Sequence, residues 1–201
     1  MAKMTCQKKG LRYMKRPLIL ASNSARRKEL MEMIGVPFTV CPAEHEEPVD
    51  ENTLLEIAIE KVSLAKAQDV AKRYPDALVL GSDTVVAIGG DVLGKPKDRE
   101  DCVRMLKKLS GRTHTVITGF AFVSAEETYV SSEKTEVTFA KLSKEEIERY
   151  ADTEEPYDKA GAYAIQGKSA VFVKGIKGDV YTVIGLPLQR VYQYLHKKNY
   201  L

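Results

Sequence analysis

Residues 18–35 carry the sequence LILASNSARRKELMEMIG, in which a short apolar run precedes three polar residues and a helical pattern. The run LILA is typical of a short buried strand. Ser22, Asn23 and Ser24 favour turns and helix caps, because their side chains bond to nearby backbone groups. The segment RRKELMEMI places its apolar residues on one helical face, and Gly35 is a typical helix stop. The stretch therefore predicts a strand, a turn and a helix.

Two arginines, Arg26 and Arg27, stand in the first turn of this predicted helix. The helix dipole disfavours cations at that end, so the placement makes sense if an anion binds there. Free backbone N–H groups, the serine hydroxyls and the two guanidinium groups would then converge on one anion, most naturally a phosphate. The alternative is two solvated arginines on a surface helix.

Helical patterns alternate with extended ones along the rest of the chain. Thr53 with Glu56, and Ser143 with Glu146, form capping-box patterns that each open a helix. The extended segment after the first of these helices is broken by residues 81–83, Gly-Ser-Asp. The predicted helices span residues 52–75, 99–111, 143–151 and 186–197, and the extended segments span 77–88, 114–124 and 128–142, with a hairpin pattern over 170–185 around Lys177-Gly178-Asp179.

This alternation predicts an α/β protein with a mixed β-sheet flanked by helices. The length of 201 residues suits one domain, which we place at residues 17–201. Residues 1–16 show no clear periodicity, and we expect them to form a tail outside the fold.

Composition excludes several classes of function. The net charge of +3 is too small to indicate a nucleic-acid-binding protein. Three widely spaced cysteines, Cys6, Cys41 and Cys102, favour neither a disulfide framework nor a zinc cluster and suit a reducing cytosol. No apolar stretch approaches the ~20 residues that span a bilayer. We therefore expect a cytoplasmic protein that binds neither nucleic acid nor membrane.

Polar residues interrupt the apolar pattern at three places. Asp83 stands between two apolar runs, where an aspartate is costly unless it is hydrogen-bonded, paired or metal-bound; the alternative is a bulge or turn residue. The segment EHEEP supplies Glu44, Glu46 and Glu47, and taken alone it is a solvated acidic loop. Residues 155–167, EPYDKAGAYAIQG, mix small and polar side chains, which predicts a close-packed ligand loop or an ordinary glycine-rich connection.

Two other stretches are similar to the phosphate-binding P-loop, and each lacks a part of it. GGDVLGKP has Lys95 at the right spacing, but Pro96 replaces the hydroxyl residue that binds magnesium. QGKSAVFV has Ala162 where the first glycine is required, and an extended segment follows instead of a helix. We exclude both as P-loops, although Lys95 can still reach a phosphate from another scaffold.

Taken together, LILASNSARRKEL, EIAIEKVSLAKA, GSDTVV, LGKPKD, LSGRTHTVITG, EPYDKAGAYAIQG and VIGLPL resemble the Maf family in order and spacing, over residues 17 to about 195. The resemblance implies a fold like that of inosine triphosphatases, with two lobes around a central cleft. It also implies a nucleoside triphosphate pyrophosphatase that needs Mg²⁺ or Mn²⁺, and a homodimer. SARRKEL, Thr84 and Gln166 are similar to the branch that acts on dTTP and UTP. Ala25 and Ser82 depart from the usual proline and alanine, and neither change removes a functional group.

The resemblance also implies roles for individual residues. Asp83 is carried over as the proton acceptor that activates water, or as a metal ligand together with Glu46 or Glu47. The triphosphate is expected to bind Ser24, Arg26, Arg27, Lys61, Lys95 and Lys159, and base choice is expected to depend on Arg26, Thr84 and Gln166. The resemblance further implies a role in house-cleaning of modified nucleotides and in cell division arrest. The alternative function is a regulatory protein that inhibits septum formation through a partner rather than by catalysis.

Overall fold

A single seven-stranded mixed sheet forms the centre of the computed structural model, which describes residues 15–44, 49–50 and 53–201. The strand order is β2-β1-β3-β5-β6-β7, with β4 paired to β3. Strand β1 is parallel to β2 and β3, and the other pairs are antiparallel. The strands are β1 (Leu18–Leu20), β2 (Thr39–Val40), β3 (Leu78–Ile88), β4 (Asp91–Leu93), β5 (Thr113–Val123), β6 (Thr128–Phe139) and β7 (Val173–Lys177).

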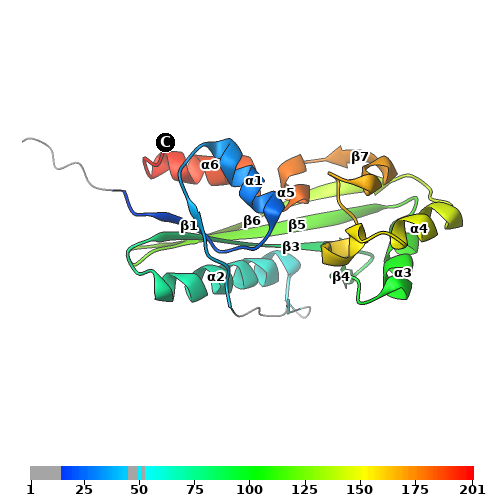
Figure 1. The fold of residues 1–201 in the computed structure, drawn as a ribbon, viewed down its shortest axis with the longest axis horizontal. Coiled ribbons are helices and arrows are strands. Elements are labelled where there is room, and N and C mark those ends of the chain that lie inside the picture. Colours follow the sequence, from blue (N-terminus) through cyan, green and yellow to red (C-terminus); the bar gives the residue numbers. More distant parts are fainter. Residues whose placement is uncertain (1–14, 45–48, 51–52) are drawn as a thin grey trace, which may run out of the picture.

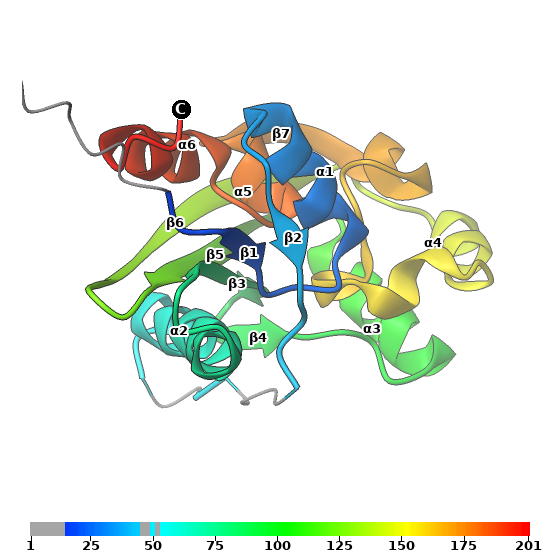
Figure 2. The ribbon, with the colours of Figure 1, turned by 60° about the vertical axis from the view of Figure 1, so that its left-hand side comes forward.

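Helices cover both faces of the sheet. Figures 1 and 2 show α2 on one face and α1, α5 and α6 on the other, with α3 and α4 grouped at the far end of the long strands. The α-helices are α1 (Ala25–Ile34), α2 (Leu55–Arg73), α3 (Arg99–Leu109), α4 (Lys144–Ala151), α5 (Val180–Ile184) and α6 (Leu188–Lys197), and the 3₁₀ helices are η1 (Glu155–Asp158), η2 (Ala160–Ala162) and η3 (Lys168–Phe172).

The long strands β3, β5 and β6 connect two lobes, each with its own core. In the first lobe, Leu30 of α1 and Leu195 of α6 belong to one cluster, and Val70 of α2 belongs to another. In the second lobe, Leu106 of α3 and Phe139 of β6 belong to a separate cluster. The predicted fold class, a mixed sheet flanked by helices in two lobes, is therefore confirmed. In the described part of the chain, no helix has the length and apolarity to cross a bilayer.

The strand, turn and helix predicted at residues 18–35 form as expected. Ser24 is the N-cap of α1, and its hydroxyl accepts a hydrogen bond from the backbone N–H of Arg27 at 3.4 Å. Gly35 ends the helix in the left-handed conformation, with φ of 78°, which a residue with a side chain rarely adopts. The capping box of Ser143 and Glu146 is also present, at the start of α4.

The predicted break at residues 81–83 is wrong, because β3 runs unbroken from Leu78 to Ile88. Residues 81–83 pair in register with residues 119–121 of β5, so the neighbouring strand satisfies their backbone groups. The small and polar side chains that suggested a turn instead serve close packing and the cleft, as described below.

Two other local predictions also differ from the structure. Leu54 is the N-cap of α2, and the Thr53 hydroxyl donates to Asp50 at 2.7 Å, so the first capping box does not form. The predicted hairpin at residues 170–185 is wrong, because Asp179 accepts hydrogen bonds from the N–H groups of Tyr181 and Thr182 and caps α5. The side chain of Asp179 thus satisfies backbone N–H groups that would pair with a neighbouring strand in a hairpin.

Helix α2 lies unusually close to the sheet at two glycines. A Cβ atom at Gly81 would lie 2.4 Å from the carbonyl oxygen of Ser63, and one at Gly119 would lie 2.6 Å from that of Ile59. Gly119 is the cross-strand partner of Asp83, so both glycines and Asp83 face α2. Any side chain at either glycine would therefore push the helix away from the strand that carries Asp83.

Replacing Gly119 by alanine tests this contact. We expect Gly119→Ala to lower the free energy of unfolding by ~1–3 kcal/mol, because the added methyl group overpacks against the backbone of α2. Urea denaturation followed by circular dichroism measures the change. The matched control is Gly175→Ala on β7, where an added Cβ has no atom within 4 Å. Equal unfolding midpoints for the two variants would contradict the close approach.

Candidate active site

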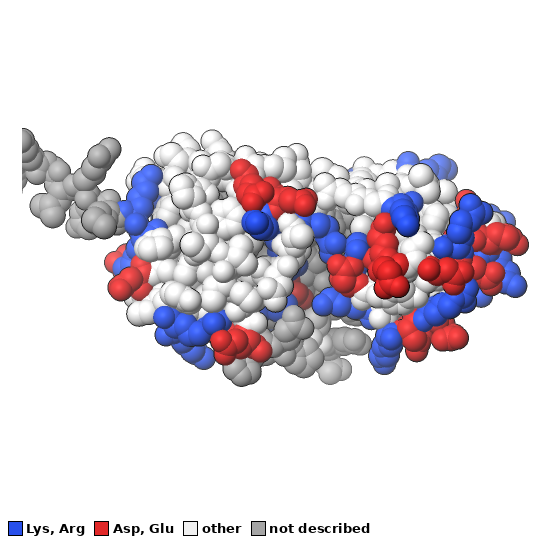
Figure 3. Space-filling view, in the orientation of Figure 1, with Lys and Arg blue, Asp and Glu red and all other residues white. Residues whose placement is uncertain are grey.

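A cleft of about 810 Å³ lies between the two lobes and is lined by residues of both. Its size falls within the ~300–1,000 Å³ that is usual for small-molecule sites. Figure 3 shows Lys and Arg side chains gathered where the surface between the two halves is hollowed. The predicted site residues that line the cleft are Ser24, Arg26, Arg27, Asp83, Thr84, Lys95, Lys159 and Gln166.

Asp83 lies in the middle of β3, where the strand passes between the lobes. Its side chain is 21% exposed, and the ammonium group of Lys66 on α2 lies 2.7 Å from its Oδ1. Lys66 is itself only 13% exposed. The expectation that an aspartate at this position needs a partner is therefore met, since a half-buried carboxylate is costly without an opposite charge. Oδ2 of Asp83 has no hydrogen-bond partner among the described residues.

Lys66 lines the cleft, although the sequence analysis did not predict it as a site residue. Lys61 was predicted to bind the triphosphate, but it does not line the cleft. Lys61 is exposed on α2, and it is not among the residues that line the cleft. Lys66 falls within the buried stripe of α2, three or four positions from Val62, Ser63 and Val70. A lysine inside an apolar stripe was the available signal, because a buried cation requires a partner.

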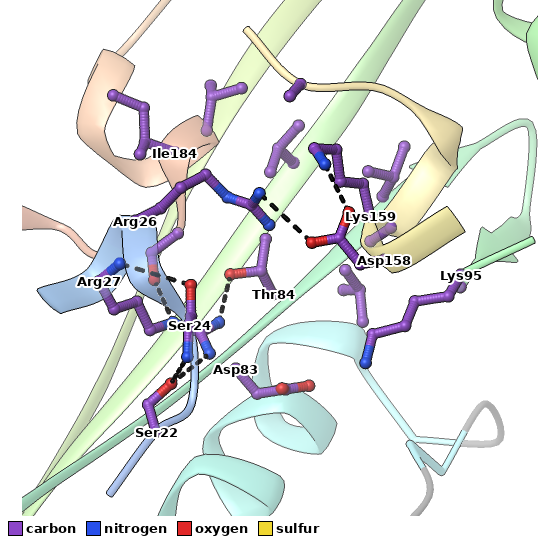
Figure 4. Close-up of a pocket in the computed structure, with 18 of the residues that line it drawn as sticks. Ser22, Ser24, Arg26, Arg27, Asp83, Thr84, Lys95, Asp158, Lys159 and Ile184 are labelled. Carbon is purple, nitrogen blue, oxygen red and sulfur yellow. Dashed lines mark hydrogen bonds and ion pairs between the residues drawn. The ribbon is translucent and has the colours of Figure 1, made fainter. Parts of the chain in front are cut away.

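The start of α1 forms one wall of the cleft, and Arg27 connects it to two other elements. The Arg27 Nε donates to the carbonyl of Gly185 at 2.8 Å, and Nη2 donates to the hydroxyl of Thr84 at 3.1 Å. Thr84 also shares a hydrogen bond with Thr118 of β5 at 2.9 Å. Figure 4 shows Arg27 and Thr84 beside Ser24. Arg27 therefore both lines the cleft and holds α1 against β3 and the end of α5.

The opposite wall carries Asp158 and Lys159, and the carboxylate of Asp158 meets one cation from each wall. The guanidinium of Arg26 lies 3.7 Å from Asp158, and the Lys159 ammonium pairs with the same carboxylate (Figure 4). Lys159 also donates to the backbone carbonyl of Glu155 at 2.6 Å. Burial by itself would raise the pKa of Asp158, but Lys159 and Arg26 hold it below its usual range. Lys95, after β4, also lines the cleft.

The segment after Lys159 closes the second wall, and its backbone is strained. Gly161 and Ala162 both have positive φ, 71° and 61°, and Ala162 is fully buried. A non-glycine residue rarely takes this conformation, and the strain persists only where the surroundings hold it. One such constraint is the 2.8 Å hydrogen bond between the hydroxyl of Tyr163 and Nε2 of His114. Gln166 follows at the exposed end of the segment.

The predicted acidic metal ligands are only partly described. Glu46 and Glu47 lie outside the described residues, and Glu44 is exposed and paired with Arg73 at 2.9 Å. Among residues 15–44, 49–50 and 53–201, no group of three or more His, Cys, Asp or Glu side chains is arranged to share a metal. The cleft carboxylates in this part of the chain are Asp83 and Asp158. Mg²⁺ often binds through one or two carboxylates plus substrate phosphates and water, and Asp83 fits that small donor set.

Known proteins are similar to this chain in fold and in sequence. A solved structure of the Ham1 protein of Staphylococcus aureus superposes with a TM-score of 0.53 at 15% identity, covering 91% of this chain and 100% of that one. A Symbiobacterium thermophilum protein named dTTP/UTP pyrophosphatase is 50% identical over 184 residues, covering 91% of this chain and 94% of its own length. A Bacillus cytotoxicus protein of the same name is 49% identical over 173 residues, covering 86% and 91%.

In a comparison with protein families, the model described as Maf-like protein matches residues 17–198. That range contains the arginine pair of α1, the Asp83 of β3 and the glycine-rich segment that closes the cleft. Because the match covers nearly the whole fold, the chain belongs to the Maf family.

Proposed function

We propose that this protein is a nucleoside triphosphate pyrophosphatase that hydrolyses dTTP and UTP to the nucleoside monophosphate and pyrophosphate. The observation that carries the proposal is Asp83, held by Lys66 at the floor of a cleft whose walls supply Arg26, Lys95 and Lys159. The names and high identity of the two relatives above support both the reaction and the choice of pyrimidine substrates.

The charges of the cleft suit a triphosphate. A nucleoside triphosphate carries about four negative charges, and phosphoryl transfer depends mainly on positioning and on neutralising charge. Arg26 and Lys159 now share the carboxylate of Asp158, which supplies one negative charge between the lobes. A bound phosphate would compete with this carboxylate for both cations. The cations come from α1, from the loop after β4 and from the end of η1, so a substrate that contacts all three bridges the two lobes.

Asp83 is the group that acts on water in this proposal. Its Oδ2 accepts a proton from a water molecule as the water oxygen bonds to the α-phosphorus. The bond from that phosphorus to the bridging oxygen breaks, and the bridging oxygen leaves with pyrophosphate. Lys66 holds Oδ1, which orients the carboxylate so that Oδ2 faces the cleft.

A divalent cation, Mg²⁺ or Mn²⁺, is part of the proposal. When bound, such an ion neutralises phosphate charge and eases deprotonation of water. Asp83 is the described residue that would hold it, with Glu46 or Glu47 as a second ligand. Both uses of Asp83, as a base and as a ligand, need its carboxylate to be charged and to face the cleft.

Base selection is assigned to Arg26, Thr84 and Gln166. Gln166 offers a donor and an acceptor, as does the edge of uracil or thymine. Thr84 follows Asp83 directly but points to the opposite face of β3, where Arg27 and Thr118 engage its hydroxyl. Gln166 is therefore the residue of the three best placed to contact a base without breaking other contacts.

The reaction is tested by separating products across the common nucleotides. With Mg²⁺ or Mn²⁺ present, we expect UTP and dTTP to give monophosphate and pyrophosphate, and EDTA to abolish turnover. Ion-exchange chromatography of the nucleotides with a coupled pyrophosphate assay measures this. Release of orthophosphate with a diphosphate left behind would overturn the proposed reaction.

Asp83→Asn should lower turnover by ~10²-fold or more while the protein stays folded, because asparagine keeps the size and loses the charge. The measurement is kcat for UTP, with circular dichroism as the check on folding. Recovery of activity at high Mn²⁺ would identify Asp83 as chiefly a metal ligand and would contradict its role as base.

Lys66 and Lys61 form a matched pair on one helix. We expect Lys66→Met to lower kcat/KM for UTP by ~10-fold or more, because Asp83 loses the partner that orients it. Lys61→Met removes the same charge from an exposed position outside the cleft lining and should leave kcat/KM nearly unchanged, because solvent and salt screen an exposed charge. Comparable losses in both variants would show that net charge, and not the Asp83 contact, matters.

Three further expectations stay predictions: the homodimer, the cytoplasmic location and the role in cell division. The Asp83→Asn variant also separates catalysis from action through a partner. A cellular effect that persists without turnover would favour the regulatory alternative, because a partner surface does not need Asp83.

A further inference from the structure

The turn that carries Gln166 is held by the side chain of Glu155, a residue outside the cleft lining. Oε2 of Glu155 accepts a hydrogen bond from the backbone N–H of Lys168 at 3.0 Å, and Oε1 accepts one from the N–H of Ser169 at 3.5 Å. The hydroxyl of Tyr150 on α4 donates to Oε1 at 3.1 Å. One carboxylate therefore joins α4, η1 and the start of η3.

A glycine at position 167 leaves space for the carboxylate of Glu155, whereas the backbone conformation at this position does not need a glycine. Its φ of −174° is an extended conformation that any residue adopts. A Cβ atom at this position would lie 2.3 Å from Oε1 of Glu155, far inside contact distance. The atoms that it would meet are the end of the Glu155 side chain, so an alanine at 167 would displace this carboxylate from its hydrogen bonds.

The other end of the turn is closed by Ser169. Its buried hydroxyl donates to the carbonyl of Ala164 at 2.9 Å and accepts from the N–H of Ala164 at the same distance. Residues 164 and 169 are thereby joined, with Gln166 between them at the cleft. The position of Gln166 thus depends on Ser169, which in turn lies against Glu155.

Glu155 is suited to this task by its charge. Burial by itself would raise its pKa, but hydrogen bonds from the N–H of Lys168, from Tyr150 and from Ser169 outweigh burial and hold the pKa below its usual range. Glu155 is therefore ionised at neutral pH, and a charged acceptor makes stronger hydrogen bonds to backbone N–H groups than a neutral one.

We propose that Glu155 is a positioning residue for base selection, whose carboxylate holds the turn that presents Gln166 to the base. The proposal rests on the proposed function, in which Gln166 contacts uracil or thymine. A site that hydrogen-bonds its substrate discriminates only if its polar groups are held in place. Loss of Glu155 therefore lowers preference among bases more than it lowers the rate of the chemical step at Asp83.

A double-mutant cycle on Glu155 and Gly167 tests this. We expect Glu155→Ala and Gly167→Ala each to lower the ratio of kcat/KM for UTP over GTP by ~10-fold, mainly through KM for UTP. Gly167→Ala in the Glu155→Ala background should add little, because the carboxylate that the new Cβ would strike is gone. Additive losses would overturn the proposal, since they would mean that Gly167 serves the site independently of Glu155.

Two matched variants separate positioning from general destabilisation. Glu154→Ala removes the neighbouring exposed carboxylate and should leave the UTP to GTP ratio unchanged. Glu155→Gln keeps an oxygen acceptor for the N–H of Lys168 and should retain part of the preference. If Glu155→Ala does not fold, Glu155→Gln and Gly167→Ala carry the test, and an unchanged ratio in both overturns the proposal.

The structural half of the proposal has a readout that does not depend on catalysis. Hydrogen exchange at the amides of Lys168 and Ser169 should accelerate in Glu155→Ala, and unchanged exchange would contradict the proposal. Gln166→Glu separates the role of Gln166 in contacting the base from the role of Glu155 in positioning Gln166. If Gln166→Glu shifts the UTP to GTP ratio and the Glu155 and Gly167 variants do not, the positioning role of Glu155 is wrong while the role of Gln166 stands. If Gln166→Glu lowers activity on all nucleotides equally, the assignment of Gln166 to the base is wrong.

Discussion

The close approach of α2 to the sheet is the constraint on which the site depends. Gly81 and Gly119 present bare backbone to the carbonyls of Ser63 and Ile59, so the helix lies nearer to β3 than any side chain would allow. At this distance Lys66 reaches Asp83. The ion pair between Lys66 and Asp83 thus depends on the two glycines of the neighbouring strands β3 and β5. A close packing of backbones places the charged pair, and hydrophobic contacts elsewhere in α2 keep the helix there.

Three of the cations that line the cleft are paired with its two described carboxylates. Lys66 is paired with Asp83, and Arg26 and Lys159 share Asp158. Pairing lowers the cost of holding several half-buried charges in a small space. It also links the two lobes, because Arg26 belongs to α1 and Asp158 to η1. The cations still outnumber these carboxylates in the lining, which suits an anionic ligand.

Local patterns in the sequence predicted the elements that depend mainly on local interactions. Helix α3, the capping box of α4 and the cap and stop of α1 all follow from residues within a turn of one another. The extended segments predicted at 114–124 and 128–142 also form, as the antiparallel strands β5 and β6. Patterns that depended on distant partners were less informative. The Gly-Ser-Asp sequence at 81–83 indicated a break, and Asp179 was placed in a hairpin although it caps a helix.

By itself, the sequence determined the family, the fold class and several of the polar residues that line the cleft, because their order and types are recognisable without contacts. The tertiary structure alone decided that Lys66 meets Asp83. The apolar stripe of α2 can indicate that Lys66 lies on the covered face, but only the packed sheet shows which carboxylate lies opposite it. The tertiary structure also decided that Gly167 lies against Glu155, a relation between residues 12 positions apart that no local pattern encodes. Side chains that meet across elements are set by packing, and packing is a property of the whole fold.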